Sequence, residues 1–127
     1  MSANRADLVR QMQEASAILL EEKGYVSFVD VLMRIEKLTK ADYDAWRFGR
    51  TSCLESVISV NLTKMNHLLR AFQQNARTGG LRPSRTAYLS WGRGPKRQLR
   101  FSKSSTPNIE EAYATHFLKP KEGGYWG

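Results

Sequence analysis

The sequence predicts a mainly helical α+β fold: a helical N-terminal part, a helix-turn-helix followed by a basic β-hairpin, and a closing C-terminal helix. Apolar residues recur at helical spacing through most of residues 3–77, alternate with polar residues over 86–102, and return to helical spacing after Pro107. A chain of 127 residues with 41% hydrophobic and 25% charged residues is also typical of one globular domain. We expect that domain to span residues 1–118, followed by a mobile tail over 119–127, with docking of Tyr125 and Trp126 as the alternative.

The first sixty residues are predicted to contain four helices, most of them short. The first runs from Ala3 to Lys23 and ends at Gly24, because its apolar residues recur every three or four positions. Three approximate capping boxes mark the starts of the next helices: Ser27 with Asp30, Thr39 with Asp42, and Ser52 with Glu55. The segment 46–50 (Trp-Arg-Phe-Gly-Arg) is interpreted as a corner of the core with packed arginine stems. A partner-binding anchor or a second phosphate contact is the alternative there.

A longer amphipathic helix is predicted from Leu62 to Arg77, with a brief turn before it at 60–61 and two glycines after it to end it. Its apolar residues cluster on one side of a helical wheel: Leu62, Met65, Leu68, Leu69 and Phe72. The opposite side is polar and contains no carboxylate: Thr63, Asn66, His67, Arg70, Gln74 and Arg77.

Residues 86–102 are predicted to form a β-hairpin, because polar and apolar residues alternate on both sides of the loop sequence Gly-Arg-Gly-Pro-Lys at 92–96. The alternation predicts that Trp91 faces the core together with Leu89. It also predicts that Tyr88 faces outward, on the side of Thr86 and Ser90, while Leu99 and Phe101 point inward on the returning strand.

A closing helix is expected after the hairpin, with Thr106 as its N-cap and Pro107 as its first residue. Two glutamates, Glu110 and Glu111, fall in its first turn, where the helix dipole favours negative charge. Its predicted buried side consists of Ile109, Ala112, Tyr113 and Phe117.

The distribution of charge is more informative than the net charge of +8. No acidic residue occurs between Glu55 and Glu110, and ten basic residues lie in that segment of 54 residues. The rest of the chain has ten basic and twelve acidic residues, so the whole positive excess lies in one segment. Because unbalanced cations repel one another in the folded chain, we expect a polyanion to compensate them. The part over 52–103 is therefore the predicted nucleic-acid-binding part.

The order of elements over 52–102 resembles a winged helix-turn-helix: a short helix, a turn, a longer helix and a hairpin. The resemblance is one of architecture and is attached to no particular family. It implies that the 62–77 helix enters a groove of DNA and that the hairpin acts as the wing. Arg, Asn, Gln and Thr on the polar side of that helix are side chains that hydrogen-bond with base edges in the major groove.

The predicted nucleic-acid-binding residues fall into three groups. The helix contributes Thr63, Asn66, His67, Arg70, Gln74 and Arg77 to groove and backbone contacts. The connection to the hairpin contributes Arg82 and Arg85, and the returning strand contributes Arg100 and Lys103, all for contacts with the backbone. The hairpin contributes Tyr88 for stacking on a base and its tip for phosphate or minor-groove contacts, through Arg93, Lys96 and Arg97.

Other chemistries find little support in the sequence, and we expect no enzyme, cofactor or metal site. Cys53 is the only cysteine, which excludes an intrachain disulfide and fits a cytoplasmic, reducing compartment; we interpret it as buried and structural. His67 and His116 are too few and too far apart for a zinc site. No apolar run approaches the ~20 residues that span a bilayer, so no membrane contact is expected.

DNA is the leading partner, and the protein would be a transcriptional regulator or an accessory factor of a mobile element or phage. RNA is the near alternative, because a basic hairpin with an exposed Tyr88 would also suit it. A third hypothesis is a protein-interaction module that docks its basic surface on an acidic partner. A homodimer through the N-terminal helices, from Leu8 to Ile35, is compatible with the DNA hypothesis, since paired reading helices need symmetric half-sites.

Overall fold

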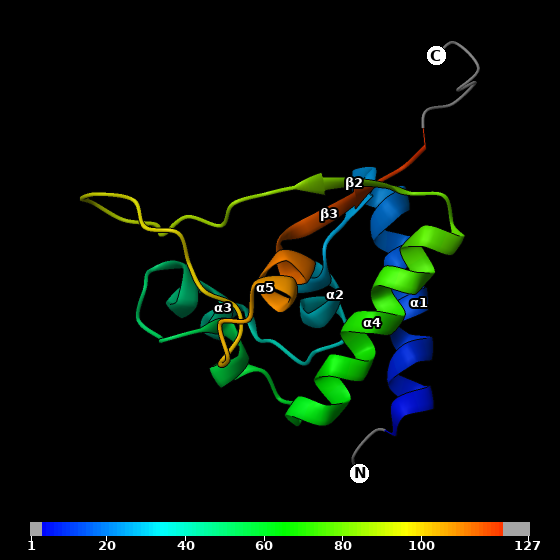
Figure 1. Ribbon diagram of the computed structural model, residues 1–127, viewed down its shortest axis with the longest axis horizontal. Coiled ribbons are helices and arrows are strands. Elements are labelled where there is room, and N and C mark those ends of the chain that lie inside the picture. Colours follow the sequence, from blue (N-terminus) through cyan, green and yellow to red (C-terminus); the bar gives the residue numbers. More distant parts are fainter. Residues whose placement is uncertain (1–3, 121–127) are drawn as a thin grey trace.

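The computed structural model describes residues 4–120 and contains five α-helices, one short 3-10 helix and a small antiparallel sheet within them. In chain order these are α1 (Arg5–Lys23), β1 (Tyr25–Val26), α2 (Phe28–Arg34), α3 (Lys40–Arg47), the 3-10 helix η1 (Leu54–Val57), α4 (Leu62–Thr78), β2 (Arg82–Arg85), α5 (Pro107–Ala114) and β3 (Thr115–Leu118). The α+β class is confirmed. Figure 1 shows α1 and α4 side by side, with the segment after β2 extending to the far end of the long axis.

The helix starts are fixed by local side-chain caps, as the sequence predicts. Ser27 Oγ accepts a hydrogen bond from the amide of Asp30 at 3.1 Å, and Thr39 Oγ1 accepts one from the amide of Asp42 at 3.1 Å. The first helix ends as predicted, because Gly24 adopts the left-handed conformation with φ 81° and its amide closes on the carbonyl of Leu20.

The third predicted capping box is wrong. Residues 54–57 form a 3-10 helix whose N-cap, Cys53, makes no side-chain cap, and Glu55 is buried instead of capping. The Glu55 carboxylate accepts hydrogen bonds from the amide of Lys103 at 2.8 Å and from the hydroxyl of Tyr113 at 2.9 Å. Both partners lie about fifty residues away in sequence, so the local sequence around Glu55 does not predict these contacts.

The sheet was not predicted. β3 lies between β1 and β2 and is antiparallel to both, with Val26 opposite Phe117 and Pro83 also opposite Phe117. The closing helix therefore ends at Ala114, and Phe117 reaches the core from a strand. The predicted N-cap at Thr106 and first residue at Pro107 are confirmed, although Thr106 makes no side-chain cap bond.

One hydrophobic core connects the described residues from Leu8 to Phe117. The apolar stripe of α1 is buried against α4, and the centre is aromatic: Phe28 contacts Phe72 and Tyr113, and Trp46 contacts Phe101. Trp46 is 1% exposed and its Nε1 donates to the carbonyl of Arg100 at 2.9 Å, so its predicted place in the core is confirmed. Cys53 is also buried, as expected.

Lys119, the first residue of the predicted mobile tail, lies next to the start of β1. The amide of Lys119 donates to the carbonyl of Gly24 at 3.0 Å, and its ammonium lies 3.5 Å from Glu21 Oε2. Lys119 is therefore held beside β1. Residues 121–127, with Tyr125 and Trp126, lie outside the described residues, as does Ala3 at the other end.

Candidate nucleic-acid interface

The polar side of α4 is an exposed stripe with no carboxylate, as the sequence predicts. Met65, Leu68, Leu69, Phe72 and Ala76 are buried, whereas Thr63, His67, Arg70, Gln74 and Arg77 are exposed and Asn66 is half-buried. Asn61 caps the helix, because its Oδ1 accepts a hydrogen bond from the amide of Lys64 at 2.9 Å. Leu62 is 47% exposed instead of packed, since it is the first residue of the helix and lies beyond the edge of the core.

Most of the basic side chains predicted to bind nucleic acid have no acidic partner among residues 4–120. Only Arg85 forms an ion pair, with Glu111 at 3.1 Å. No carboxylate oxygen of the described residues lies within 4 Å of the charged side-chain nitrogens of the other members of this set: Arg70, Arg77, Arg82, Arg93, Lys96, Arg97, Arg100 and Lys103. In contrast, Arg10 and Arg34 elsewhere on the molecule are paired with Asp7 and Glu22.

The two glutamates nearest to this basic segment in sequence point inward. Glu110 accepts hydrogen bonds from the amides of Phe101 and Ser102 and from the Ser102 hydroxyl, at 2.6 to 3.2 Å. Together with Glu55, it fixes the backbone of residues 101–103, so the neighbouring Arg100 and Lys103 side chains are exposed on a rigid segment. Glu110 thus does more than complement the helix dipole.

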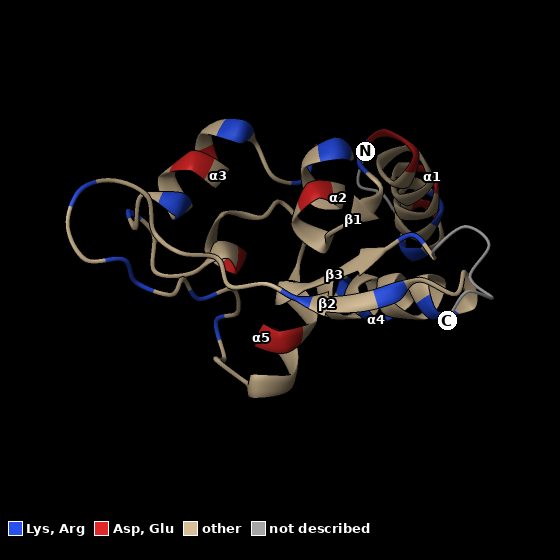
Figure 2. Cartoon of the chain, turned by 90° about the horizontal axis from the view of Figure 1, so that it is seen from above, with Lys and Arg blue, Asp and Glu red and all other residues tan. Residues whose placement is uncertain are grey.

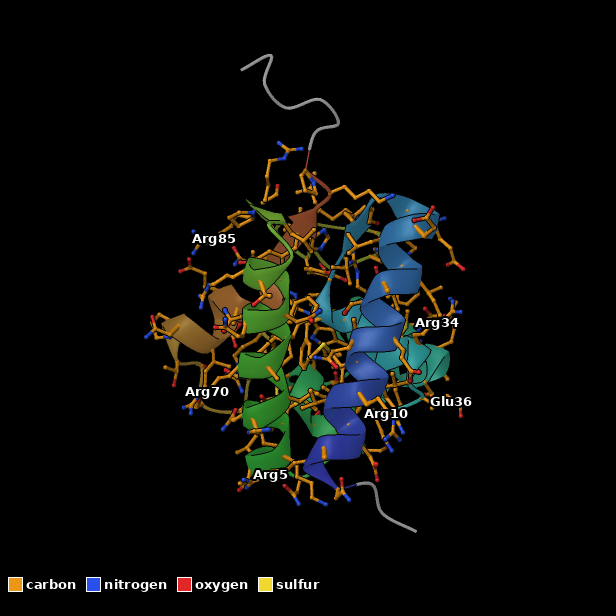
Figure 3. The ribbon with its side chains drawn as sticks, turned by 90° about the vertical axis from the view of Figure 1, so that its right-hand side faces the viewer. Arg5, Arg10, Arg34, Glu36, Arg70 and Arg85 are labelled. Atoms are coloured by element: carbon orange, nitrogen blue, oxygen red, sulfur yellow. The ribbon has the colours of Figure 1, made fainter. Side chains whose placement is uncertain are left out.

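Arg82 and Arg85 lie on β2, an edge strand of the sheet, with all four of its residues exposed. Three shallow grooves surround α5 and connect this strand to α4. Their walls include Asn66 and Arg70 in the first, Arg77 and Pro83 in the second, and Arg85 and Gln98 in the third. Figure 3 shows Arg70 and Arg85 on the same side of the molecule, away from Arg10, Arg34 and Glu36. Predicted residues from two elements therefore share one face.

The predicted hairpin is much shorter than expected. A single bridge joins Leu89 and Gln98, with hydrogen bonds from Ser90 to Arg97 at 2.8 Å and from Leu99 to Tyr88 at 2.8 Å. The rest of 86–103 has no strand pairing. The loop at 92–96 is exposed, and Lys96 Nζ donates to the carbonyl of Gly92 at 3.0 Å.

The predicted faces of the first hairpin arm are wrong. Tyr88 is 7% exposed and Ser90 is buried, whereas Leu89 and Trp91 are 42% and 38% exposed. The reason is a distant partner: the Tyr88 hydroxyl shares a 2.8 Å hydrogen bond with His116 Nε2, and its ring packs on Trp46 and Phe101. Tyr88 is therefore not available for stacking on a base. Leu99 and Phe101 are buried, as predicted.

Burial shifts the pKa values around this contact. It raises the pKa of the Tyr88 hydroxyl, so Tyr88 stays protonated at neutral pH. Burial is also the largest influence on His116 and lowers its pKa, with a smaller opposing effect from Asp30 and a smaller lowering effect from Lys23. Tyr25 stacks on the face of the His116 ring, with 5.3 Å between ring centres. The group is a structural link between β1, β3 and the hairpin arm.

The aromatic and arginine residues at 46–50 extend to the surface. Trp46 is core, but Phe48 is 44% exposed and its ring contacts that of Trp91 edge to face at 5.5 Å. The arginines do not simply pack on the core: the Arg47 guanidinium lies 4.7 Å from the Trp91 ring centre, and that of Arg50 lies 5.0 Å from the Phe48 ring centre. Sequence reasoning missed this exposed aromatic pair because it assigned Trp91 to the core.

Figure 2 shows Lys and Arg distributed along the 86–103 segment and β2, with the acidic residues concentrated on other elements, α5 included. Figure 1 places the loop at 92–96 at one end of the long axis and the C-terminal end of α4 toward the other. The basic residues thus follow the length of the molecule.

No protein-family model, curated protein or solved structure matches this chain. Within residues 4–120, no group of three or more His, Cys, Asp or Glu side chains is arranged to hold a metal ion. In the same residues, no helix combines the length and apolar character needed to cross a membrane.

Proposed function

We propose that this chain is a small DNA-binding protein that uses α4 in a groove and the 86–103 segment on the phosphate backbone, in the manner of a winged helix-turn-helix. The observation that carries the proposal is the set of eight basic side chains that lack an acidic partner among residues 4–120. Unbalanced cations attract a polyanion and release its counterions on binding.

The exposed stripe of α4 supports groove binding. It carries Asn66, Arg70 and Gln74, whose side chains offer the hydrogen-bonding groups that base edges match, and no carboxylate to repel phosphate. One α-helix fits in a major groove of DNA, and α4 is 17 residues long and exposed along that side.

A homodimer through the N-terminal helices stays a prediction. The apolar stripe of α1 is buried inside the protomer, which leaves Ile18, at 40% exposure, as the large apolar side chain that α1 offers to a partner. A dimer interface on α1 would therefore use its solvent-exposed side, because Leu8 and the other apolar residues of its buried side pack in the core of the protomer.

The test is fluorescence anisotropy with a labelled random duplex across a salt series. For the unchanged protein, the logarithm of the binding constant should fall steeply as the logarithm of the salt concentration rises. The slope should be about −0.9 for each phosphate contacted. Arg93→Gln combined with Lys96→Gln should weaken binding to every sequence and flatten the slope. Arg70→Ala or Gln74→Ala should mainly relax sequence preference, because these side chains lie on the helix proposed to read bases.

The matched control is Arg10→Gln combined with Arg34→Gln, which removes the same charge from exposed residues on another side of the molecule. This control should leave the slope unchanged. If both double variants weakened binding equally, net charge alone would explain the affinity. If the protein bound no DNA at low salt but bound an acidic protein, the protein-interaction module would be supported instead. If it bound RNA more tightly than DNA of the same length, the proposed partner would change to RNA.

A further inference from the structure

Two of the large apolar side chains exposed among the described residues are aromatic, and they contact each other. Phe48 is 44% exposed and Trp91 is 38% exposed, with ring centres 5.5 Å apart and an interplanar angle of 79°. They come from segments more than forty residues apart, the end of α3 and the first arm of the hairpin. Exposed aromatic surface that gathers in one place marks a binding site more often than scattered apolar residues do.

The two rings are held in place by their surroundings. The amide of Trp91 donates to the carbonyl of Arg47 at 2.6 Å, and the Tyr43 ring contacts the Trp91 ring edge to face at 5.8 Å. The Arg47 guanidinium lies over the Trp91 ring at 4.7 Å, so the exposed area of Trp91 lies away from Arg47. A rigid aromatic surface binds a flat ligand with little loss of side-chain entropy.

Positive charge surrounds these rings. The Arg50 guanidinium lies 5.0 Å from the Phe48 ring centre, and the Arg97 guanidinium occupies the space in which a side chain at Gly49 would stand. No carboxylate among residues 4–120 forms an ion pair with Arg47, Arg50 or Arg97. A ligand that combines a flat ring with negative charge complements this arrangement.

We propose that Trp91 stacks on an unpaired base of DNA, with the nearly perpendicular Phe48 ring against the edge of that base and Arg50 and Arg97 placed for the adjoining phosphates. The inference rests on the proposed function and narrows its substrate to a duplex that carries an unpaired nucleotide. Base stacking on aromatic side chains needs no particular sequence, because every base has a flat face. An apolar peptide would fit the rings but would leave the three arginines without a complementary charge.

The experiment compares three labelled DNA probes with equal numbers of phosphates: a blunt duplex, a duplex with a thymine overhang, and the same duplex with an abasic overhang. The overhang with bases should bind roughly five- to a hundredfold more tightly than the abasic one for each base stacked. The abasic probe keeps the phosphates and removes the rings, so the comparison measures stacking without altering the protein.

Variants locate the effect. Trp91→Leu should remove the preference for bases over abasic sites, and Trp91→Phe should retain part of it. Phe48→Leu should reduce this preference, and it provides a second test that does not depend on how Trp91→Leu affects the loop. The control is Leu89→Ala, an exposed apolar residue on the same arm. Thermal unfolding of each variant checks its fold.

The outcomes distinguish failure of the stacking site from failure of DNA binding as a whole. A base preference that disappears in the abasic probe and in Trp91→Leu supports the stacking site. Equal, salt-sensitive binding of all three probes overturns the stacking site and leaves DNA binding standing. Failure to bind any probe at low salt overturns both, and a preference unaffected by both aromatic variants places the base elsewhere.

Discussion

His116 is an example of a residue whose role only the folded chain reveals. Its ring stacks on that of Tyr25 with centres 5.3 Å apart and contacts that of Tyr88 edge to face at 5.7 Å, and its Nε2 shares a hydrogen bond with the Tyr88 hydroxyl. From the sequence, both His116 and Tyr88 are isolated residues, and Tyr88 was expected to be exposed. The 28 residues that separate them in sequence explain why the pattern of either segment gives no sign of the contact.

The stability of the fold should depend on pH through His116. Because burial lowers its pKa below 6.5, the unfolded chain binds a proton more readily than the folded chain below that pH. Stability is therefore complete above about pH 6.5 and decreases as the pH falls further. Urea unfolding over a pH series measures this slope.

The slope should be smaller in His116→Gln, which cannot be protonated in this range. His67→Gln is the matched control, because His67 is exposed on α4. An unchanged slope in His116→Gln would show that another group carries the pH dependence.

At the scale of elements, the helices could be predicted and the sheet could not. Helix starts depend on caps three residues away, such as Ser27 with Asp30, so the information is local in the sequence. The strands depend on pairing between segments far apart, and β1 is only Tyr25–Val26. The sequence of β3 also continues the helical spacing of α5, which is why Phe117 was assigned to a helix.

The candidate site divides in the same way. The exposed stripe of α4 follows from helical geometry alone, so those predicted positions agree with the structure. The hairpin faces depend on which partners the first arm meets, and Tyr88 and Trp91 exchanged their predicted places for that reason. A shift of the strand register by one residue moves every side chain of the strand to the opposite face.

Removing the cap of α4 should lower stability without changing the site chemically. Asn61→Ala loses the hydrogen bond from the Asn61 side chain to the amide of Lys64, at 2.9 Å, and should cost about 1 kcal/mol. Denaturant unfolding measures the loss. Asn61→Asp keeps an acceptor at the N-terminus and should cost much less; an equal loss in both variants would mean that the cap bond does not stabilise α4.

The whole molecule is elongated along the direction that joins α4 to the loop at 92–96 (Figure 1). A duplex that contacts both the α4 stripe and this loop must therefore lie along the long axis. A shorter duplex reaches one of the two regions and loses the phosphate contacts of the other.

Binding should therefore depend on duplex length. The salt slope should rise with length and then reach a plateau once both regions are occupied, as measured by anisotropy with duplexes of increasing length. In Arg93→Gln combined with Lys96→Gln the plateau should come at a shorter length, because the loop no longer contributes. A slope that does not change with length would indicate that one compact region makes all the contacts.

The edge strand β2 has a consequence for solubility. An exposed edge presents unpaired backbone groups that can pair with another copy of the chain, and the sequence Arg-Pro-Ser-Arg opposes this, since proline lacks an amide hydrogen and the arginines repel one another. The charges that we assign to phosphate binding therefore also keep copies of the protein apart. Changing Arg82 and Arg85 to neutral residues would remove the charge from this edge and leave Pro83 as its protection against pairing, so the proposed DNA contacts and the solubility of the protein depend on the same two side chains.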